Sequence, residues 1–206
     1  LLLSGKDCLK FLDGLSTNKV DGTCTTVFTK SNAKIIDMVE VIMVGENVAL
    51  VGHKLYKEDL LDHLNSRILQ QDVSMRDISE FNNVYIAFDE YPEEDNITVV
   101  KTFRGWIIVA PTSRSIESTL TLDAFNEYRI QNEIPHQGYE IIPSRHPFNC
   151  RLEDLVHESK GCYIGQEILT RMRSRGNMGK SLIRVEGNPE DATTVGHTHS
   201  LVIRKT

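Results

Sequence analysis

One short stretch, Lys-Gly-Cys-Tyr-Ile-Gly-Gln-Glu at residues 160–167, concentrates side chains that could do chemistry. Beyond it, apolar residues recur at helical spacing, which predicts a helix over residues 165–175 with Cys162 just ahead of its first turn. A helix N-terminus presents free N–H groups and a partial positive charge, and with Lys160 nearby it would favour the thiolate form of the cysteine. The stretch therefore predicts a reactive thiol. The alternative is that Cys162 is a small buried apolar residue, as most lone cysteines are.

Polar and basic residues extend this pattern. Gln166 and Glu167 fall in the first predicted turn, where acceptor groups suit the free amides. A local basic patch then follows, made of Arg171, Arg173, Arg175 and Lys180. Such a patch could meet an acidic partner or an RNA backbone, although a run of this kind is more often the solvated face of a helix end.

Composition bounds the class of protein. The chain has 206 residues, of which 40% are hydrophobic and 25% charged, as in a globular protein of one large or two small domains. The net charge of −6 argues against binding nucleic acid through bulk electrostatics. The four cysteines lack Cys-x-x-Cys spacing, and no stretch has the pattern of a signal peptide or a membrane span. We therefore expect a reduced, cytoplasmic protein with no membrane partner.

Hydrophobic periodicity predicts the elements that must position the cysteine stretch. Helices are predicted over residues 4–15, 54–69, 121–131 and 165–175. Strands are predicted over residues 24–29, 35–44, 48–51, 73–78, 82–88, 97–103, 106–110, 181–185 and 200–203. Hairpins outnumber crossover connections in this order, and such a mixture predicts the α+β class.

Two carboxylates interrupt the most apolar of the predicted strands. Asp37 and Glu40 lie within the run at residues 35–44, whose other members are almost all apolar. An isolated carboxylate inside a sheet costs free energy unless it is exposed or has a partner. Both residues therefore either sit where the sheet meets water or are buried with partners.

The cysteine stretch, continued by Arg171 and Arg175-Gly176, resembles the signature of the YgfZ-type folate-binding proteins, relatives of the glycine-cleavage T-protein (aminomethyltransferase). Residues 5–20 and 129–135 resemble two further segments of the same superfamily. The resemblance implies a T-protein-like fold, with mixed α+β subdomains around a central cavity and a reduced C-terminal β segment.

The same resemblance implies a division of the chain. Residues 1–178 would form the folate-binding region, with one subdomain from residues 1–30 and 112–178 and the other from residues 31–111. Residues 179–206 would form a short β segment, the remnant of a C-terminal barrel.

The implied function is that of a tetrahydrofolate-binding accessory protein for iron–sulfur cluster assembly or repair, with a link to tRNA modification. Cys162 would be the catalytic residue, in contact with the cluster, sulfur or an oxidant. The cofactor-binding residues would be Asp37, Gln131, Lys160, Tyr163, Gln166 and Glu167. The partner-binding residues would be Arg171, Arg173 and Arg175. The implied partners are a reduced folate, iron–sulfur proteins, and tRNA or RNA-modifying enzymes.

Two alternatives stay open. One is a folate-dependent aminomethyl or methyl transferase in which Asp37 does acid–base work. Against it, Met38 stands where T-proteins usually have a second aspartate, and Gln131 stands where they usually have the glutamate that holds the pterin. The chain also ends at Thr206, too soon after the cysteine stretch for a closed barrel. The other alternative is a metal-binding module, whose ligands would be His146, Cys150, His157 and Cys162, although their spacing matches no common zinc pattern.

Overall fold

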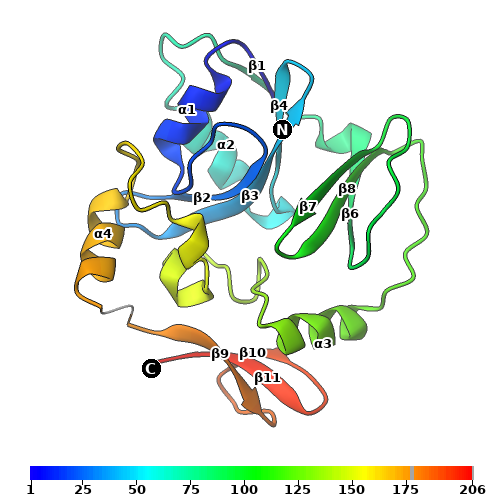
Figure 1. Ribbon diagram of the computed structural model, residues 1–206, viewed down its shortest axis with the longest axis vertical. Coiled ribbons are helices and arrows are strands. Elements are labelled where there is room, and N and C mark those ends of the chain that lie inside the picture. Colours follow the sequence, from blue (N-terminus) through cyan, green and yellow to red (C-terminus); the bar gives the residue numbers. More distant parts are fainter. Residues whose placement is uncertain (177–178, 206) are drawn as a thin grey trace.

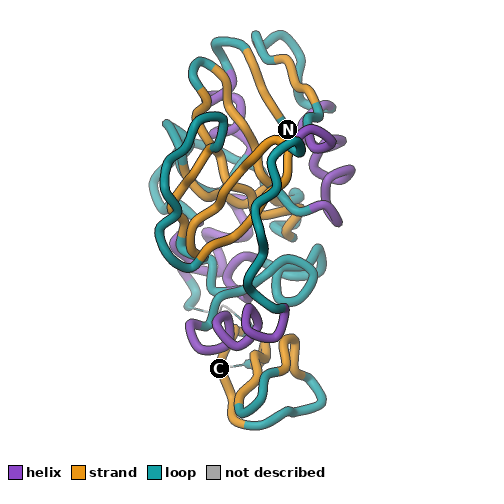
Figure 2. The backbone as a smooth tube through the Cα atoms, turned by 90° about the vertical axis from the view of Figure 1, so that its right-hand side faces the viewer, coloured by secondary structure: helices purple, strands orange, loops and turns teal. Residues whose placement is uncertain are grey.

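The computed structural model describes residues 1–176 and 179–205. In that part of the chain, the strands form three antiparallel sheets with helices packed against them, which confirms the predicted α+β class (Figure 1). Figures 1 and 2 place the last sheet at the opposite end of the long axis from the first. The middle sheet and the helix that follows it connect the two ends.

The first sheet has five strands in the order β2-β3-β4-β1-β5. Its strands are β1 (Leu2–Ser4), β2 (Cys24–Thr29), β3 (Ile35–Val44), β4 (Asn47–Val51) and β5 (Ser74–Arg76). Helices α1 (Cys8–Leu15) and α2 (Lys57–Asn65) pack against it, and η1 (Lys54–Tyr56) leads into α2. The core between them contains Phe11 and Leu12 of α1, Leu64 of α2, and Phe28 and Val39 of the sheet. Burial of these apolar faces is the main force that holds this part together.

The second sheet has three strands in the order β6-β8-β7. They are β6 (Asn82–Ala87), which follows η2 (Ser79–Phe81), β7 (Thr98–Thr102) and β8 (Gly105–Pro111). Strands β7 and β8 form a tight hairpin, with Phe103 and Arg104 in the turn and Thr102 paired with Gly105. Gly105 has φ of 118°, and a Cβ there would come within 2.5 Å of the Ala87 carbonyl oxygen. The turn therefore needs glycine, and it holds Arg104 in a fixed place.

Helix α3 (Leu122–Asn132) connects the second sheet to the last part of the chain. The Thr121 hydroxyl caps it by accepting the Ala124 N–H at 3.2 Å, as the sequence predicts. Two short turns, η3 (Pro147–Cys150) and η4 (Glu153–Leu155), then lead to α4 (Gln166–Ser174). The third sheet, in the order β10-β11-β9, is built from β9 (Ser181–Glu186), β10 (Ala192–Val195) and β11 (His199–Arg204).

Two strands are missing from the sequence-based prediction. Strand β1 fills the place between β4 and β5, and its pairing is set by contacts with residues far along the chain. Strand β10 has four residues and a register shift against β11, so its alternation is too short to detect. The C-terminal part therefore has three strands where two were predicted. Helix α2 is shorter than predicted, because it ends at Asn65 and leaves Leu69 81% exposed.

The predicted subdomain boundaries fall at different positions relative to the sheets. The boundary after residue 30 falls between β2 and β3, which are neighbouring strands of one sheet. The boundary after residue 111 coincides with the end of β8. The boundary after residue 178 lies beside residues 177–178, outside the described part of the chain.

Candidate functional site

Asp37 lies near the start of β3 and is completely buried. Its Oδ1 accepts the Met38 N–H and its Oδ2 accepts the His53 N–H, each at 2.8 Å. Burial raises the pKa of the Asp37 carboxyl to about 7, although these hydrogen bonds oppose the shift. The interpretation that Asp37 sits where the sheet meets water is therefore wrong. A carboxyl that titrates near neutrality is suited to general acid–base work.

Close approach to Asp37 depends on the glycine at the end of β4. A Cβ at Gly52 would lie 2.5 Å from Oδ2 of Asp37, so a larger residue would displace the carboxyl. Because Gly52 is small, the chain can turn beside the carboxyl and direct the His53 N–H at it. Local sequence thus creates the hydrogen bond that holds Asp37 in place.

A buried polar network surrounds Asp37 and joins three parts of the chain. Arg104, from the β7–β8 turn, donates from Nη2 to Oε1 of Glu40 and from Nη1 to Oε1 of Gln137, each at 2.8 Å. The other oxygen of Glu40 accepts the Thr25 hydroxyl at 2.5 Å. The Gln137 amide donates to the Met38 carbonyl at 2.9 Å and lies 3.5 Å from Oδ1 of Asp37. Glu40 is 2% exposed, so it too is buried with partners.

Aromatic rings line the same region. His53 follows Gly52, and its ring centroid lies 5.8 Å from that of His136, which in turn contacts Phe125 of α3 at 5.2 Å. Burial, and then the charge of Arg104, lower the pKa of His136 to about 3, so this ring is neutral at pH 7. The Nδ1 atom of His136 is buried and has no hydrogen-bond partner among the described residues. The region therefore combines a titratable carboxyl, a guanidinium and flat apolar surfaces.

Cys162 lies elsewhere, on the loop that precedes α4. It is the exposed cysteine of the four, since Cys8 and Cys150 are buried and Cys24 is half-buried. The helix begins at Gln166, after Gly165 with φ of 87°, so Cys162 precedes the first turn by more than the sequence predicts. The alternative that Cys162 is a buried apolar residue is therefore wrong.

The loop that carries Cys162 is anchored on both sides. Before it, the Lys160 ammonium donates to the carbonyl oxygens of Asp13, Ser16 and Asn18 at 2.6–2.9 Å and lies 3.0 Å from the Asp13 carboxylate. Lys160 therefore braces the segment after α1. The ammonium is fully occupied and is not a free cation for the thiol.

The other anchor of the cysteine loop lies just beyond it. The Ile164 carbonyl accepts the Thr29 hydroxyl at 2.6 Å. A Cβ at Gly165 would lie 2.7–3.0 Å from atoms of Thr29, Lys30 and Ala33, so the loop approaches the β2–β3 turn as closely as glycine allows. Tyr163 is 8% exposed and packs with Phe148 and Leu169. These contacts leave Cys162 facing outward.

Other predicted folate-binding residues are spread over different surfaces. Gln131 is exposed on the last turn of α3, and Glu167 is exposed and paired with Arg171 at 2.7 Å. Gln166 is half-buried at the start of α4, and its N–H donates to the Tyr163 carbonyl at 3.3 Å. Tyr163 packs in a cluster with Phe148 and Leu169, whereas Asp37 is hydrogen-bonded to the Met38 and His53 N–H groups. The structure therefore brings together Asp37 with residues that were not predicted, and not with the cysteine stretch.

The predicted basic patch divides into exposed and inward-facing members. Arg171 on α4 and Arg175, which follows the last residue of α4, are exposed. Arg173 donates to the carbonyl oxygens of Glu153 and Val156 at 3.2 and 3.0 Å, and its guanidinium lies 5.2 Å from the Phe148 ring centroid. Arg173 therefore fastens α4 to the η4 segment, whereas the other members of the patch, including Lys180, are exposed.

The four side chains proposed as metal ligands do not converge. Cys150 is buried, and its thiol lies 3.1 Å from the Glu140 carbonyl oxygen, whereas Cys162 is exposed. The His146 ring is 3.0 Å from the Ala33 carbonyl oxygen. Within residues 1–176 and 179–205, no group of three or more His, Cys, Asp or Glu side chains is arranged to hold a metal ion.

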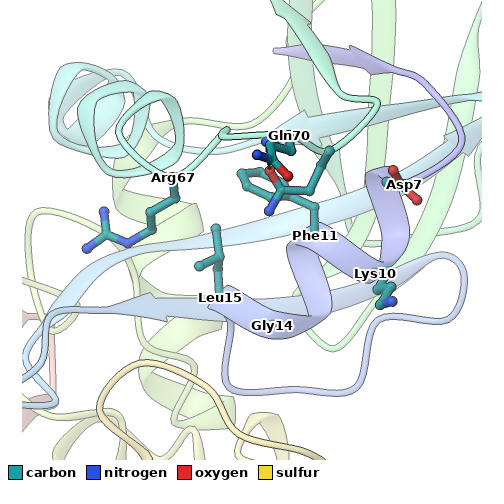
Figure 3. A pocket seen from close by; sticks show the side chains of 8 residues that line it. Asp7, Lys10, Phe11, Gly14, Leu15, Arg67 and Gln70 are labelled. Atoms are coloured by element: carbon teal, nitrogen blue, oxygen red, sulfur yellow. Dashed lines mark hydrogen bonds between the residues drawn. The ribbon is translucent and has the colours of Figure 1, made fainter.

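A surface cleft of about 440 Å³ lies away from both Asp37 and Cys162, between α1 and the loop after α2. Figure 3 shows Phe11 and Leu15 beneath it, while the charged ends of Lys10 and Arg67 point to opposite sides. Because its cations do not converge, this cleft does not form a site for an anion.

The sequence-based prediction did not include Arg104, Gln137, Gly52 or His53. The sequence contains one indication that such partners are needed. Two carboxylates inside an apolar strand require a buried cation and donors, because an unpaired buried charge is unstable. The sequence does not say which of its 23 lysines and arginines supplies the cation.

Comparison with solved structures identifies the fold. The chain superimposes on the glycine cleavage system aminomethyltransferase T from Bartonella henselae with a TM-score of 0.77 and 11% sequence identity. The match covers 99% of this chain and 75% of that chain. The chain therefore has a T-protein-like fold, as the resemblance implies. No protein-family model and no curated protein sequence matches it. Within the described residues, no helix has the length and apolar character needed to cross a membrane.

Proposed function

We propose that this chain is a tetrahydrofolate-binding accessory protein that serves iron–sulfur cluster assembly or repair, with Cys162 as its reactive residue. The observation that carries the proposal is the T-protein-like fold, which extends over 99% of the chain. We place the folate site in the region around Asp37, on the expectation from the resemblance that the fold has a central cavity. The signature at residues 160–167 supports the YgfZ-type branch over the transferases.

The chemistry around Asp37 suits a reduced folate. The pyrimidine half of a reduced pteridine is flat and the ring system carries N–H groups, which match the aromatic rings and the carboxyl of this region. Because Asp37 is completely buried, a ligand reaches the carboxyl only when the segment that contains His53 or the one that contains Gln137 moves aside. Gln131 lies on the neighbouring helix α3, where its amide would hydrogen-bond the ligand without a charge.

The anchored cysteine loop supports the second half of the proposal. A thiol that accepts sulfur, contacts a cluster or meets an oxidant must be accessible and held in a defined place. Cys162 meets both needs, because it is exposed while Lys160, Ile164 and Gly165 fix the loop on either side. The proposed partners are iron–sulfur proteins and tRNA or RNA-modifying enzymes, with the exposed Arg171 and Arg175 as the first residues to meet them.

Calorimetric titration with 5-formyltetrahydrofolate tests the folate site. We expect saturable one-to-one binding by the wild-type protein and a loss of at least tenfold in affinity for Asp37→Asn, which is about 1.4 kcal/mol. The matched control is Asp59→Asn, a change of the same type at an exposed position on α2. Absence of binding by the wild-type protein would refute the folate site.

Complementation in cells tests the cysteine. We expect Cys162→Ser to lose the ability to support an iron–sulfur enzyme, while Cys24→Ser, at a half-buried thiol, retains it. Equal support by the two variants would remove Cys162 from the proposal.

The second candidate is a folate-dependent aminomethyl or methyl transferase. The observation that favours it is the pKa of about 7 for Asp37, since a carboxyl near neutrality can exchange a proton with a folate amine. We expect no conversion of tetrahydrofolate to its methylene form with any amine donor. Turnover that Asp37→Asn abolishes would favour the transferase over the accessory role.

A further inference from the structure

Hydrogen bonds fix both the backbone of Arg104 and the two terminal nitrogens of its guanidinium. The β7–β8 turn fixes its backbone, because the Arg104 N–H donates to the Thr102 hydroxyl at 3.2 Å and Gly105 fits only without a side chain. Its Nη2 donates to Glu40 and its Nη1 to Gln137, each at 2.8 Å. Arg104 is 7% exposed, so water does not compete strongly for these bonds.

These bonds fix the orientation of the Gln137 amide. A guanidinium has only donors, so the group that faces Arg104 must be the amide oxygen. The amide nitrogen then faces the other way, where it donates to the Met38 carbonyl at 2.9 Å and lies 3.5 Å from Oδ1 of Asp37. In the flipped orientation, two donors would face each other at Arg104 and two carbonyl oxygens at Met38. Arg104 thus determines that an N–H, and not a lone pair, is directed at the carboxylate.

We propose that Arg104 is a positioning residue that acts through Gln137 to favour the ionised form of Asp37. An N–H directed at a carboxylate stabilises the anion, whereas a carbonyl oxygen in the same place would require the carboxyl to be protonated. The proposal rests on the proposed function in one respect, since it assumes that the Asp37 carboxyl meets the ligand. It adds that the ligand is a molecule with an N–H or a protonated amine, which an ionised carboxylate accepts.

Several charged or titratable groups lie around Asp37, and of these Arg104 is the one that is hydrogen-bonded to Gln137. They come from β3, the segment after β4, the β7–β8 turn and the loop after α3, and they are Glu40, His53, Tyr56, Arg104 and His136. Burial lowers the pKa of both histidines, that of His136 to about 3, so the His136 ring is neutral where Asp37 titrates. Burial raises the pKa of Tyr56, so it stays protonated there. Glu40 accepts a hydrogen bond from the Arg104 guanidinium.

The experiment is a carbon-13 NMR titration of the Asp37 carboxyl in the protein without ligand, assigned with Asp37→Asn. The variants are Arg104→Met, Gln137→Leu, and both together. We expect each single variant to raise the Asp37 midpoint by about one pH unit, and the double variant to raise it no further than the larger single shift. Gln137→Leu keeps the Arg104–Glu40 pair, so it tests the proposal even if Arg104→Met does not fold.

The control is Arg114→Met, which removes the same charge from an arginine that pairs with Glu94 and takes no part in the network. We expect it to leave the Asp37 midpoint unchanged. An unchanged midpoint in Gln137→Leu would overturn the proposal. A midpoint shift in the double variant that equals the sum of the shifts in Arg104→Met and Gln137→Leu would also overturn the proposal. Arg104 would then act directly through its charge.

A second measurement separates this proposal from the proposed function. For Gln137→Leu, we expect the affinity for 5-formyltetrahydrofolate to fall about fivefold at pH 7, because the ionised fraction of Asp37 falls by that factor, and to recover at pH 9, where Asp37 ionises without help. A fall that is equal at both pH values would assign Gln137 a merely structural role and would overturn the proposal. If the wild-type protein binds no folate at either pH, the proposed function fails, and the NMR titration alone decides the role of Arg104.

Discussion

Two buried arginine–glutamate pairs join the parts of this molecule, and their surroundings differ. Arg129 of α3 binds Glu140 at 2.8 Å, with exposures of 1% and 0% for the two side chains. Arg104 of the β7–β8 turn binds Glu40 at the same distance, with exposures of 8% and 2%. The first pair ties α3 to the C-terminal sheet, and the second ties the middle sheet to the first sheet.

The Arg129 pair is the more completely satisfied one. Glu140 accepts the hydroxyls of Thr193 and Thr194, each at 2.6 Å, and the His136 N–H at 3.1 Å, in addition to the guanidinium. The Arg129 guanidinium also lies 4.9 Å from the Tyr139 ring centroid. A pair with so many partners has one stable arrangement and serves to hold the fold.

The Arg104 pair has fewer partners and stands beside a titratable group. Glu40 accepts one hydroxyl, from Thr25, besides the guanidinium. The second arm of Arg104 goes to Gln137, whose amide reaches Asp37. The difference indicates that one pair serves stability and the other also serves the candidate site. Four predictions test this contrast.

Arg129→Met should have the largest effect. It leaves Glu140 buried without its cation, and breaking a buried pair in this way costs about 5 kcal/mol at the upper end of the usual range. We expect a large fall in the melting temperature by circular dichroism, or no folded protein. The control is Arg151→Met, whose pair with Glu133 is partly exposed and should cost less than about 1 kcal/mol. Similar losses in the two variants would contradict the structural role of Arg129.

Asp37→Asn should change the pH dependence of stability. The folded-state pKa of about 7 lies above the unfolded value near 3.9, so the folded protein keeps this proton more tightly. The stability that this group contributes is complete below about pH 4 and is lost as pH rises through about 7. Asp37→Asn should therefore gain stability relative to wild type as pH rises across this window, by up to about 4 kcal/mol.

The measurement is urea unfolding of both proteins at several pH values from 4 to 8. The difference between their unfolding free energies isolates Asp37, because the buried histidines, with lowered pKa values, occur in both proteins. A difference that does not vary with pH would show that Asp37 does not titrate in this window.

Arg104→Met should cost less than Arg129→Met, about 3 kcal/mol at the lower end of the range for buried pairs. The Arg104 guanidinium makes fewer hydrogen bonds than the Arg129 guanidinium, so its removal leaves fewer buried groups without a partner. We expect a measurable loss in urea unfolding together with a higher Asp37 midpoint. A loss equal to that of Arg129→Met, with no change at Asp37, would remove the distinction between the two pairs.

The sequence predicts most of this fold because most of its elements are local. Helix α3 is predicted to within one residue, because Thr121 caps it, Asp123 lies in its first turn and Pro135 follows it. The β7–β8 hairpin is predicted from two apolar runs around a glycine. Strand β1 is not predicted, because its partners in β4 and β5 lie 45 to 74 residues away.

The candidate site is less predictable for the same reason. Asp37 is identifiable as a carboxylate inside an apolar strand, but its network depends on Arg104 and Gln137, which come from a turn and a loop with no periodic pattern. The sequence places Lys160 beside the thiol, whereas its ammonium binds carbonyl oxygens more than 140 residues away. Side chains that act over such separations are chosen by the fold and not by local spacing.

The smallest effect on stability is expected from removing the threonine hydroxyls that donate to Glu140 and Glu40. Thr194→Val removes a hydroxyl that donates to Glu140 at 2.6 Å and accepts from Arg129 at 2.8 Å, at a buried position. Thr25→Val removes the matching hydroxyl from Glu40, at a half-buried position. We expect losses of about 2 kcal/mol and about 1 kcal/mol in urea unfolding, because water can replace the second hydroxyl but not the first. A larger loss for Thr25→Val would mean that the Glu40 pair, and not the Glu140 pair, depends more on full satisfaction.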